Sequence, residues 1–232
     1  MSKNKRGKFI VLDGTDGSGK ATQTNILVKK LKKEGKKVKT IDFPQYKDNF
    51  FGKMIGECLV GDYGDFIAVD PHIASALYAA DRWESSEMIN KWISNGYIVI
   101  ADRYTSSNQI HQGGKIKDSK KRREFLKWLE KMEFEVLRIP KPDAIVYLDV
   151  PYEITKKLLQ EKNAINKKKY SIGKKDLAEN NKKHLSDSRK SAIKLVGECN
   201  NWIKIDCVKK GEMMSIEEIN EIIWSKVRQI IK

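Results

Sequence analysis

The chain has 232 residues, of which 40% are hydrophobic and 33% are charged, so it can form a sizeable core without disulfides or a structural metal. Lysine and arginine outnumber aspartate and glutamate by 46 to 31, which gives a formal net charge of +15, and only eight of the basic residues are arginines. This charge suits a polyanionic partner, such as nucleic acid, an anionic membrane or a phosphorylated metabolite, although lysines spread over helices more often form a solvated face. No apolar run approaches the roughly 18 residues that a membrane span requires.

The N-terminus and the cysteines favour a particular cellular location, the reducing cytoplasm. The stretch Met1–Gly7 is charged and lacks the long apolar segment of a secretory signal. Cys58, Cys199 and Cys207 form neither a paired framework nor a metal-binding spacing, which suits a reducing environment. We therefore expect a cytoplasmic protein without a membrane partner. The three histidines have no metal-like spacing and are expected to be ordinary surface or core residues: His72, His111 and His184.

Short runs of β-branched and aromatic residues alternate with longer amphipathic segments along the chain. The short runs predict strands, in order, at Phe9–Leu12, Val38–Phe43, Tyr97–Ala101, Ala144–Leu148 and Trp202–Asp206. The longer segments predict helices at Lys20–Lys33, Pro71–Ser94, Ser119–Leu137, Pro151–Lys162, Leu177–Asn200 and Ile216–Ile231. Strands separated by helices favour a parallel sheet covered on both faces, and no linker or repeat divides the chain, so residues 1–232 are predicted to form one domain.

Local signals refine three of these helices. Asp70 immediately before Pro71 is typical of a helix start, and Ser215 followed by Glu218 has the spacing of a capping box. In the predicted helix Ser119–Leu137, four apolar residues at spacings of three and four predict one buried face: Phe125, Leu129, Met132 and Val136. The segment Lys162–Lys175 carries six lysines and predicts a mobile charged loop between two helices.

The segment Gly14–Lys20 follows the first predicted strand directly and opens the first long helix, with the GxxxxGK spacing of a P-loop. Its glycines let several backbone N–H groups converge on one anion, and the helix N-terminus adds its dipole. Lys20 supplies a point charge for the β- and γ-phosphates. The residues expected to contact ATP are Gly14, Thr15, Asp16, Gly17, Ser18, Gly19, Lys20, Ala21 and Thr22.

One position departs from the P-loop pattern. The pattern has Ser or Thr after the lysine, with a hydroxyl that helps to hold Mg²⁺, whereas this chain has Ala21 and then Thr22. Adjacent side chains point about 100° apart around a helix, so Thr22 is expected to contact a phosphate oxygen rather than take that place. Magnesium is then expected to depend on phosphate oxygens, water and a nearby carboxylate. The alternative is a nucleotide-binding protein without catalysis.

Asp102 and Arg103 come at the carboxyl end of the predicted strand Tyr97–Ala101, the edge of a parallel sheet where ligands bind. An aspartate there can organise Mg²⁺ and its waters, and the adjacent arginine can bind phosphate with its planar fork. Alone, such a pair is usually a surface ion pair, but the upstream P-loop favours a functional role.

Taken together, the motifs resemble those of the thymidylate kinase (dTMP kinase) family, within the P-loop nucleoside-monophosphate kinases. The matching segments run in order along the chain: Asp13–Thr24, Phe43–Tyr46, Leu77–Trp83, Asp102–Tyr104 through Ser107 and Asn108 to Gln112 and Gly113, Pro140–Asp143 and, more weakly, Asp176-x-x-Glu179. The resemblance implies a three-layer α/β P-loop NTPase fold with a five-stranded parallel sheet and a mobile lid at about residues 160–176. It also implies the reaction ATP + dTMP → ADP + dTDP with Mg²⁺, and a homodimer.

The same resemblance implies roles for individual residues. Lys20, Asp16, Arg103 and Asp102 would form the catalytic group: Lys20 would hold the donor phosphates, Arg103 the acceptor phosphate, and Asp102 or Asp16 the metal, partly through water. Asp16 would also lie near the acceptor 3′-hydroxyl. The acceptor nucleotide would further contact Phe43 and Pro44, Tyr78 stacking on thymine, Arg82 reading a base carbonyl, Asn108 facing the N3 edge, and Ser107 and Gln112.

The residues themselves leave other interpretations open. Tyr78 and Arg82 lie on an amphipathic helix, where the tyrosine could be core and the arginine could pair with Asp81 or Glu84. Base choice depends on few side chains, so a kinase for another deoxynucleotide or a nucleoside remains an alternative. A non-catalytic P-loop protein that binds nucleotide or nucleic acid is another, although no aromatic-interleaved basic patch or nucleic-acid motif supports a nucleic-acid partner.

The source of positive charge for the transition state also departs from the family. Some members have an arginine inside the P-loop, where this chain has Gly17, and others have one in the lid, which here has none. The candidates are lid lysines or an arginine on the following helix: Lys162, Lys167, Lys168, Lys169 and Arg189.

Overall fold

Five parallel strands form one sheet in a computed structural model that describes residues 5–165 and 182–232, with side chains from 5 to 159 and from 182 to 232. Their spatial order is β2-β3-β1-β4-β5. The strands are β1 (Lys8–Gly14), β2 (Val38–Asp42), β3 (Ile98–Asp102), β4 (Ala144–Asp149) and β5 (Trp202–Asp206). The five predicted strands and their parallel arrangement are confirmed, with ends shifted by at most two residues.

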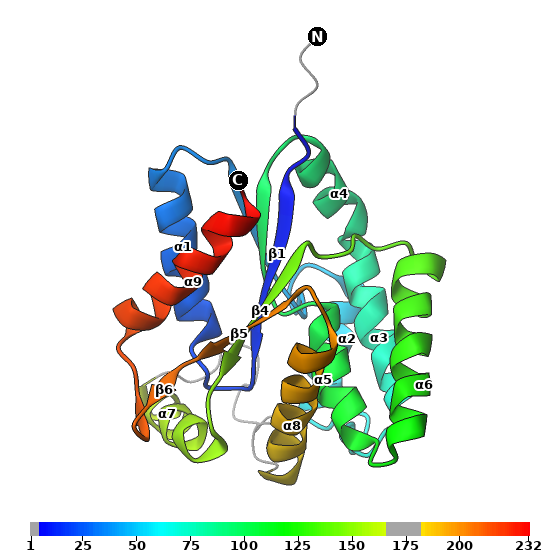
Figure 1. The fold of residues 1–232 in the computed structure, drawn as a ribbon. Coiled ribbons are helices and arrows are strands. Elements are labelled where there is room, and N and C mark those ends of the chain that lie inside the picture. The colour runs from blue at the N-terminus through cyan, green and yellow to red at the C-terminus, as the bar shows by residue number, and fades with distance from the viewer. Residues whose placement is uncertain (1–4, 166–181) are drawn as a thin grey trace.

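The helices cover both faces of this sheet (Figure 1). They are α1 (Lys20–Lys33), α2 (Phe50–Leu59), α3 (Pro71–Glu84), α4 (Ser86–Ser94), α5 (Thr105–Lys115), α6 (Ser119–Glu130), α7 (Tyr152–Ile165), α8 (Lys182–Glu198) and α9 (Ile216–Ile230), with a π-helix η1 (Lys131–Val136). A two-stranded hairpin, β6 (Val208–Lys209) and β7 (Glu212–Met213), precedes α9. The sequence did not predict α2, α5 or this hairpin.

Alternation along β1 explains the three layers. Phe9 and Val11 belong to a buried cluster under α4, α5 and α8, whereas Ile10 and Leu12 belong to a second cluster under α1 and α9. All four side chains are fully buried because β1 lies between β3 and β4 in the middle of the sheet. The expected α/β three-layer architecture is therefore confirmed. The lid expected at residues 160–176 lies outside the described side chains.

The predicted helix Pro71–Ser94 is interrupted at Ser85. This residue has φ −95° and ψ −2°, and its backbone N–H bonds to Arg82 O, so the chain turns before α4 begins. The Ser85 side chain is buried and its Oγ accepts a hydrogen bond from Asn49 Nδ2 at 3.0 Å. The hydrogen bond from Asn49, the residue before α2, therefore stabilises the interruption between α3 and α4. Hydrophobic periodicity within one segment does not predict such a long-range contact.

The predicted apolar face of Ser119–Leu137 is correct at its start and wrong at its end. Phe125 and Leu129 are buried, but Val136 is 66% exposed. The last turn is a π-helix, in which Leu137 N–H bonds to Met132 O, five residues back. Because a π-turn is wider than an α-turn, the buried face of this segment changes direction after Leu129. Val136 then points to solvent, and Glu133 is buried in its place.

Both predicted helix starts are confirmed. Asp70 accepts a hydrogen bond from His72 N–H at 2.8 Å, and Ser215 and Glu218 form both bonds of a capping box. Among the helices in residues 5–165 and 182–232, none combines the length and apolar character needed to cross a bilayer.

The start of α2 allows a test of close packing. A Cβ added at Gly52 would lie 2.1 Å from Gln45 O and 2.9 Å from Asp81 Oδ1. Gly52→Ala is therefore expected to lower the free energy of unfolding by about 1–3 kcal/mol, measured by urea denaturation. Gly197→Ala is a matched control in α8, because nothing lies within 4 Å of its added Cβ, and it should be neutral or stabilising by up to about 1 kcal/mol. Equal losses in both variants would contradict this assignment.

Candidate active site

The P-loop joins the end of β1 to the start of α1. Gly17 and Gly19 have φ values of 81° and 86°, which residues with a Cβ rarely adopt. Lys20 Nζ donates to Gly14 O and Thr15 O, both at 3.0 Å, so the lysine is folded back over the loop. Burial, followed by the nearby charge of Arg103, lowers the pKa of Lys20.

Two buried hydroxyls in this loop have no hydrogen-bond partner within the described part of the chain. They are Thr15 Oγ1 and Ser18 Oγ. Buried polar atoms are normally paired, and unpaired ones commonly mark the place of a ligand or an ion. The loop therefore has donors to offer an anion beyond its backbone N–H groups.

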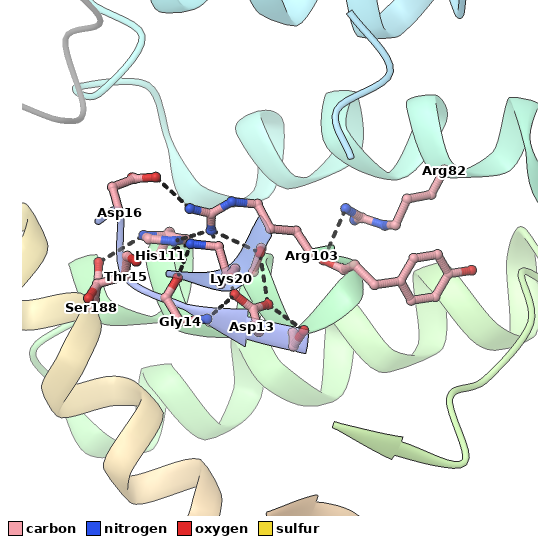
Figure 2. Close-up of polar contacts among 12 residues, drawn as sticks. Asp13, Gly14, Thr15, Asp16, Lys20, Arg82, Arg103, His111 and Ser188 are labelled. Carbon is pink, nitrogen blue, oxygen red and sulfur yellow. Dashed lines mark hydrogen bonds and ion pairs between the residues drawn. The ribbon is translucent and has the colours of Figure 1, made fainter. Parts of the chain in front are cut away.

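Arg103 connects the P-loop to the end of β3 (Figure 2). Its Nη2 lies 2.6 Å from Asp16 Oδ1, and its Nη1 lies 3.6 Å from Asp13 Oδ1. Burial alone would lower the pKa of Arg103, but the carboxylates of Asp16, Asp13 and Asp102 outweigh burial and raise it. Arg103 has φ 68°, an unusual backbone conformation for a residue other than glycine, and its N–H bonds to Leu12 O at 2.9 Å.

Two aspartates lie near these cations: Asp13, which is buried, and Asp102, which is partly exposed and lines the cavity described below. Asp13 is fully buried and its Oδ2 accepts hydrogen bonds from Ser106 Oγ at 2.5 Å and Ser107 Oγ at 2.9 Å. Burial raises the pKa of Asp102, while Lys20 and then Arg103 oppose that rise. The edge of the sheet thus gathers cations and carboxylates in a small, water-poor space.

The contacts of His111 determine its tautomer. Ser188 Oγ donates its one proton to His184 O at 2.7 Å, so it must accept from His111 Nδ1–H at 3.0 Å. His111 Nε2 is then the acceptor for Arg103 Nη1, 3.2 Å away. A neutral histidine therefore helps to orient Arg103. Burial first, then Arg103 and His184, holds the pKa of His111 well below its usual range.

A second group of side chains surrounds Arg82, which lies to one side of the Arg103 group (Figure 2). Arg82 is 2% exposed and pairs with Glu133, not with Asp81 or Glu84: its Nη2 lies 2.6 Å from Glu133 Oε1. Its guanidinium carbon lies 5.8 Å from the centre of the Tyr104 ring. Burial raises the pKa of Glu133, and Arg82 opposes this rise.

One cavity of about 620 Å³ connects both groups. Of the predicted site residues, Gly14 and Thr15 do not line this cavity but accept hydrogen bonds from Lys20 through their carbonyl oxygens. The rest line it: Asp16, Gly17, Ser18, Gly19, Lys20, Ala21, Thr22, Phe43, Pro44, Tyr78, Arg82, Asp102, Arg103, Ser107, Asn108 and Gln112. The structure thus brings the predicted residues together. Arg189 instead pairs with Asp149, with Nε and Oδ1 2.7 Å apart. The lid lysines Lys162, Lys167, Lys168 and Lys169 lie outside the described side chains.

The cavity also contains residues for which no functional role was predicted from the sequence. His111 follows Arg103 and Ser107 at intervals of four, a helical spacing that could have identified it. Tyr104 also lines the cavity; it lies in the matching segment Asp102–Tyr104, but no role was predicted for it. Glu133 lies behind the cavity lining, and no sequence pattern indicates it, because a π-turn and a long-range contact with Arg82 place it. On the side of α9, four apolar side chains also line the cavity: Met213, Met214, Ile216 and Ile219.

The donor set available for a metal ion is small. No group of three or more His, Cys, Asp and Glu side chains in the described ranges is arranged to hold a metal ion. Asp16 and Asp102 both line the cavity beside the P-loop. Magnesium usually binds one or two carboxylates together with substrate phosphates and water, so these oxygen ligands fit Mg²⁺ only in combination with a bound nucleotide.

The surroundings of Gly17, the P-loop position predicted to lack a positive charge, leave little room for a side chain. A Cβ there would lie 2.8 Å from both Leu159 Cγ and Thr155 O on α7. With the positive φ, this contact excludes a larger residue unless α7 moves. Positive charge at the transferring group must therefore come from elsewhere in the chain.

Comparisons with known proteins agree with this geometry. A family model for thymidylate kinase matches residues 12–218. The chain is similar to the thymidylate kinase of Mycobacterium tuberculosis, at 32% identity over 147 residues, which cover 63% of this chain and 67% of that protein. It is also similar to the Plasmodium falciparum thymidylate kinase, at 28% identity over 223 residues, or 96% and 93% of the two chains. A solved structure of thymidylate kinase from Candida albicans shares the fold, with a TM-score of 0.72 at 23% identity over 98% of this chain and 94% of that one.

The buried histidines predict an acid-sensitive stability. Burial and then Lys115 lower the pKa of His184 from 6.5 to about 4, and the pKa of His111 is lowered too. The unfolded chain therefore binds more protons than the folded chain below about pH 6.5. The free energy of unfolding should fall as the pH drops from 6.5 toward 4, as measured by urea denaturation at steps of pH.

The variant His111→Gln/His184→Gln should show a shallower pH slope between pH 7 and 5, above the range where most carboxylates titrate. His72→Gln, at a half-exposed position on α3, is the control and should keep the wild-type slope. An unchanged slope in the double variant would contradict the assignment.

Proposed function

Because the chain belongs to the thymidylate kinase family, we propose that its cavity carries out the transfer of the γ-phosphoryl group from ATP to dTMP, giving ADP and dTDP. The protein is an ATP-dependent phosphotransferase of the nucleoside-monophosphate kinase group. The observation that carries the proposed division of roles is the single cavity in which the P-loop, Arg103 and the Tyr78–Arg82 segment meet. A cavity of about 620 Å³ can hold the reacting parts of two nucleotides side by side.

We assign the donor phosphates to the P-loop. The backbone N–H groups around Gly17 and Gly19, with the N-terminus of α1, form an anion site. Lys20 already lies over the loop, and a phosphate oxygen would replace the carbonyl oxygens that it now contacts. The buried hydroxyls of Thr15 and Ser18 support this assignment because they lack partners within the described residues.

We assign the acceptor phosphate to Arg103. Asp16 and His111 hold its guanidinium in place from two sides, so little reorganisation is needed when an anion binds. Phosphoryl transfer depends mainly on positioning and on positive charge near the transferring group. Lys20 and Arg103 supply such charge within one cavity. No general base is required, since the attacking phosphate oxygen is already an anion.

We assign the thymine to the pocket around Tyr78 and Arg82. Phe66 lies 5.9 Å from Tyr78 between ring centres, and Phe43 with Pro44 completes an apolar wall. Arg82 and Asn108 provide polar groups at the inner end, and Gln112 Oε1 is a buried acceptor without a partner among the described residues. An apolar pocket with few fixed polar groups is typical of a site for a planar base.

Asp102 and Asp16 are the side chains proposed to hold Mg²⁺, directly or through water. When bound, the ion would neutralise charge on the donor phosphates. Ala21 offers no hydroxyl to it, so the oxygen ligands beyond these carboxylates must come from the phosphates and water.

The remaining expectations concern the whole molecule. We propose that residues 1–232 form one domain with its lid at about 160–176, working in the cytoplasm with its three thiols free. We also propose a homodimer. Its support is an apolar stripe on α3, formed by Ile73, Ala76, Ala80 and Trp83 at helical spacing, in which Ile73 is 66% exposed and Trp83 is 53% exposed.

The function is tested by a coupled ADP-release assay with ATP and Mg²⁺ against dTMP, dUMP, dCMP, dGMP, UMP and thymidine. Selective turnover of dTMP is expected, because the pocket joins an apolar wall to the Arg82 and Asn108 groups. Turnover of another acceptor would keep the phosphate roles and overturn the base assignment. Bound nucleotide without any turnover would indicate a binding protein.

The absence of a hydroxyl at Ala21 predicts that restoring one raises the apparent affinity of the enzyme for Mg²⁺. Ala21→Ser restores the hydroxyl of the P-loop pattern and should lower the Mg²⁺ concentration for half-maximal activity by on the order of 10-fold, since even outer-shell partners change metal affinity that much. Thr22→Ala, one residue along, is the control and should leave that concentration unchanged. If both variants behave like the wild type, the metal is bound without any contribution from this turn of α1.

A further inference from the structure

Glu133 is a buried carboxylate for which no role was predicted from the sequence. It lies on the π-helix η1, is 1% exposed, and its Oε1 is shared by two donors from other helices. One is Arg82 Nη2 of α3 at 2.6 Å, and the other is Asn108 Nδ2 of α5 at 3.2 Å. Both partners line the cavity. The π-turn thus places one charge behind the two polar groups at the end of the proposed thymine pocket.

The contacts of Asn108 determine which way its amide points. Asn108 Nδ2 donates to Ser75 O and to Glu133 Oε1, both at 3.2 Å. Both of those atoms are acceptors, so the reversed amide would set its oxygen against two oxygens. Asn108 is therefore held with its Nδ2 toward α3 and η1, and Oδ1 is the acceptor that remains for a ligand in the cavity.

Arg82 is fixed in the complementary sense, because a guanidinium can only donate. Glu133 offsets its charge, so the inner end of the pocket combines a donor and an acceptor without net charge. A 4-oxo pyrimidine presents a carbonyl acceptor beside an N3–H donor, which matches this pair. A 4-amino pyrimidine instead has an amino donor at C4 and an acceptor at N3. Its amino group would then face the Arg82 donor, and its N3 would face the Asn108 Oδ1 acceptor.

We propose that Glu133 is a positioning residue that sets the hydrogen-bond polarity of the base pocket, through Arg82 and Asn108, and so selects a 4-oxo over a 4-amino pyrimidine. The proposal deepens the proposed function and rests on it for the identity of the ligand. Glu133 does not touch the base in this arrangement. It acts by deciding which atoms its two partners present.

The geometry of the Arg82–Glu133 ion pair is not the one expected if the pair served only to stabilise the fold. Glu133 Oε2 and Arg82 Nε are both buried without a hydrogen-bond partner among the described residues, and a single contact replaces the two-pronged pairing that these groups can form. Removing charges from water is costly, and apolar residues often stabilise such a position equally well. A role in fixing the orientation of neighbouring groups accounts for a buried charge that stability does not require.

The decisive variant is Glu133→Gln, which keeps the shape and one acceptor oxygen but adds an N–H₂ donor and removes the charge. The added donor can replace one of the two acceptors that hold the Asn108 amide, so that only Ser75 O still favours the original orientation and the polarity is fixed less strongly. The probes are dTMP and 5-methyl-dCMP, which share the ring methyl, sugar and phosphate and differ only at the edge that is read. The readouts are kcat/KM for each acceptor and the dissociation constant of each without ATP.

The expected result is that Glu133→Gln lowers the dTMP to 5-methyl-dCMP ratio at least 10-fold, chiefly through KM and the dissociation constants. Glu130→Gln is the matched control, because Glu130 ends α6 one turn earlier, is exposed and pairs only with Lys141 at 2.7 Å among the described residues. It should keep the wild-type ratio. If Glu133→Gln weakens both nucleotides by the same factor, Glu133 is a structural residue and the proposal is overturned.

A second variant keeps the test decisive if Glu133→Gln does not fold. Asn108→Ala leaves the Arg82–Glu133 pair intact and removes the acceptor, so the ratio should again fall, and an unchanged ratio would overturn the proposal. Wild-type turnover reports separately on the proposed function. If the wild type phosphorylates neither nucleotide, that function fails, while the ratio of dissociation constants in the variants still supports or overturns the polarity assignment.

Discussion

The site depends on the parallel pairing of β1 with β3. Leu12 lies opposite Asp102 in this pair, and the next hydrogen bond, from Arg103 N–H to Leu12 O, ties the residue after β3 to the strand that leads into the P-loop. Phe43 N–H bonds to Asp102 O on the other side, which brings in the segment after β2. A slip of one residue would turn every side chain to the opposite face and separate Arg103 from Asp16. Backbone register, more than any side-chain contact, sets the distance between the P-loop and Arg103, the two proposed phosphate sites.

Much of the framework could be predicted because it follows from apolar periodicity and glycine spacing. Strands β1, β3 and β4 contain continuous apolar runs, and the P-loop is defined by local sequence. Helix α5 was missed for a related reason: its buried residues include Thr105, Ser106, Asn108 and Gln112, so the face that points inward is polar. When the buried face of a helix consists of polar residues, hydrophobic periodicity does not predict that helix.

The residues that line the site were predicted better than the hydrogen bonds between them. Local motifs and the family resemblance identified Arg82 and Asn108, but their common partner Glu133 is 51 residues from Arg82 and 25 from Asn108 in sequence. Its inward direction also depends on a π-turn that a regular helical period does not describe. The same holds for His111, whose tautomer follows from the bond between Ser188 and His184 O on a distant helix. Such features arise only when separate elements meet.

The sheet also separates two of the three apolar clusters in the described residues, and these two share no residue. Phe43 and Tyr104, on the proposed acceptor side of the cavity, belong to one cluster, while Ile219, beside the P-loop helix, belongs to the other. Side chains that do not touch usually contribute independently to stability. One wall of the cavity can therefore be repacked during evolution without disturbing the other, so that under the proposed assignment acceptor preference can drift in a lineage while the residues around the phosphate donor stay constant.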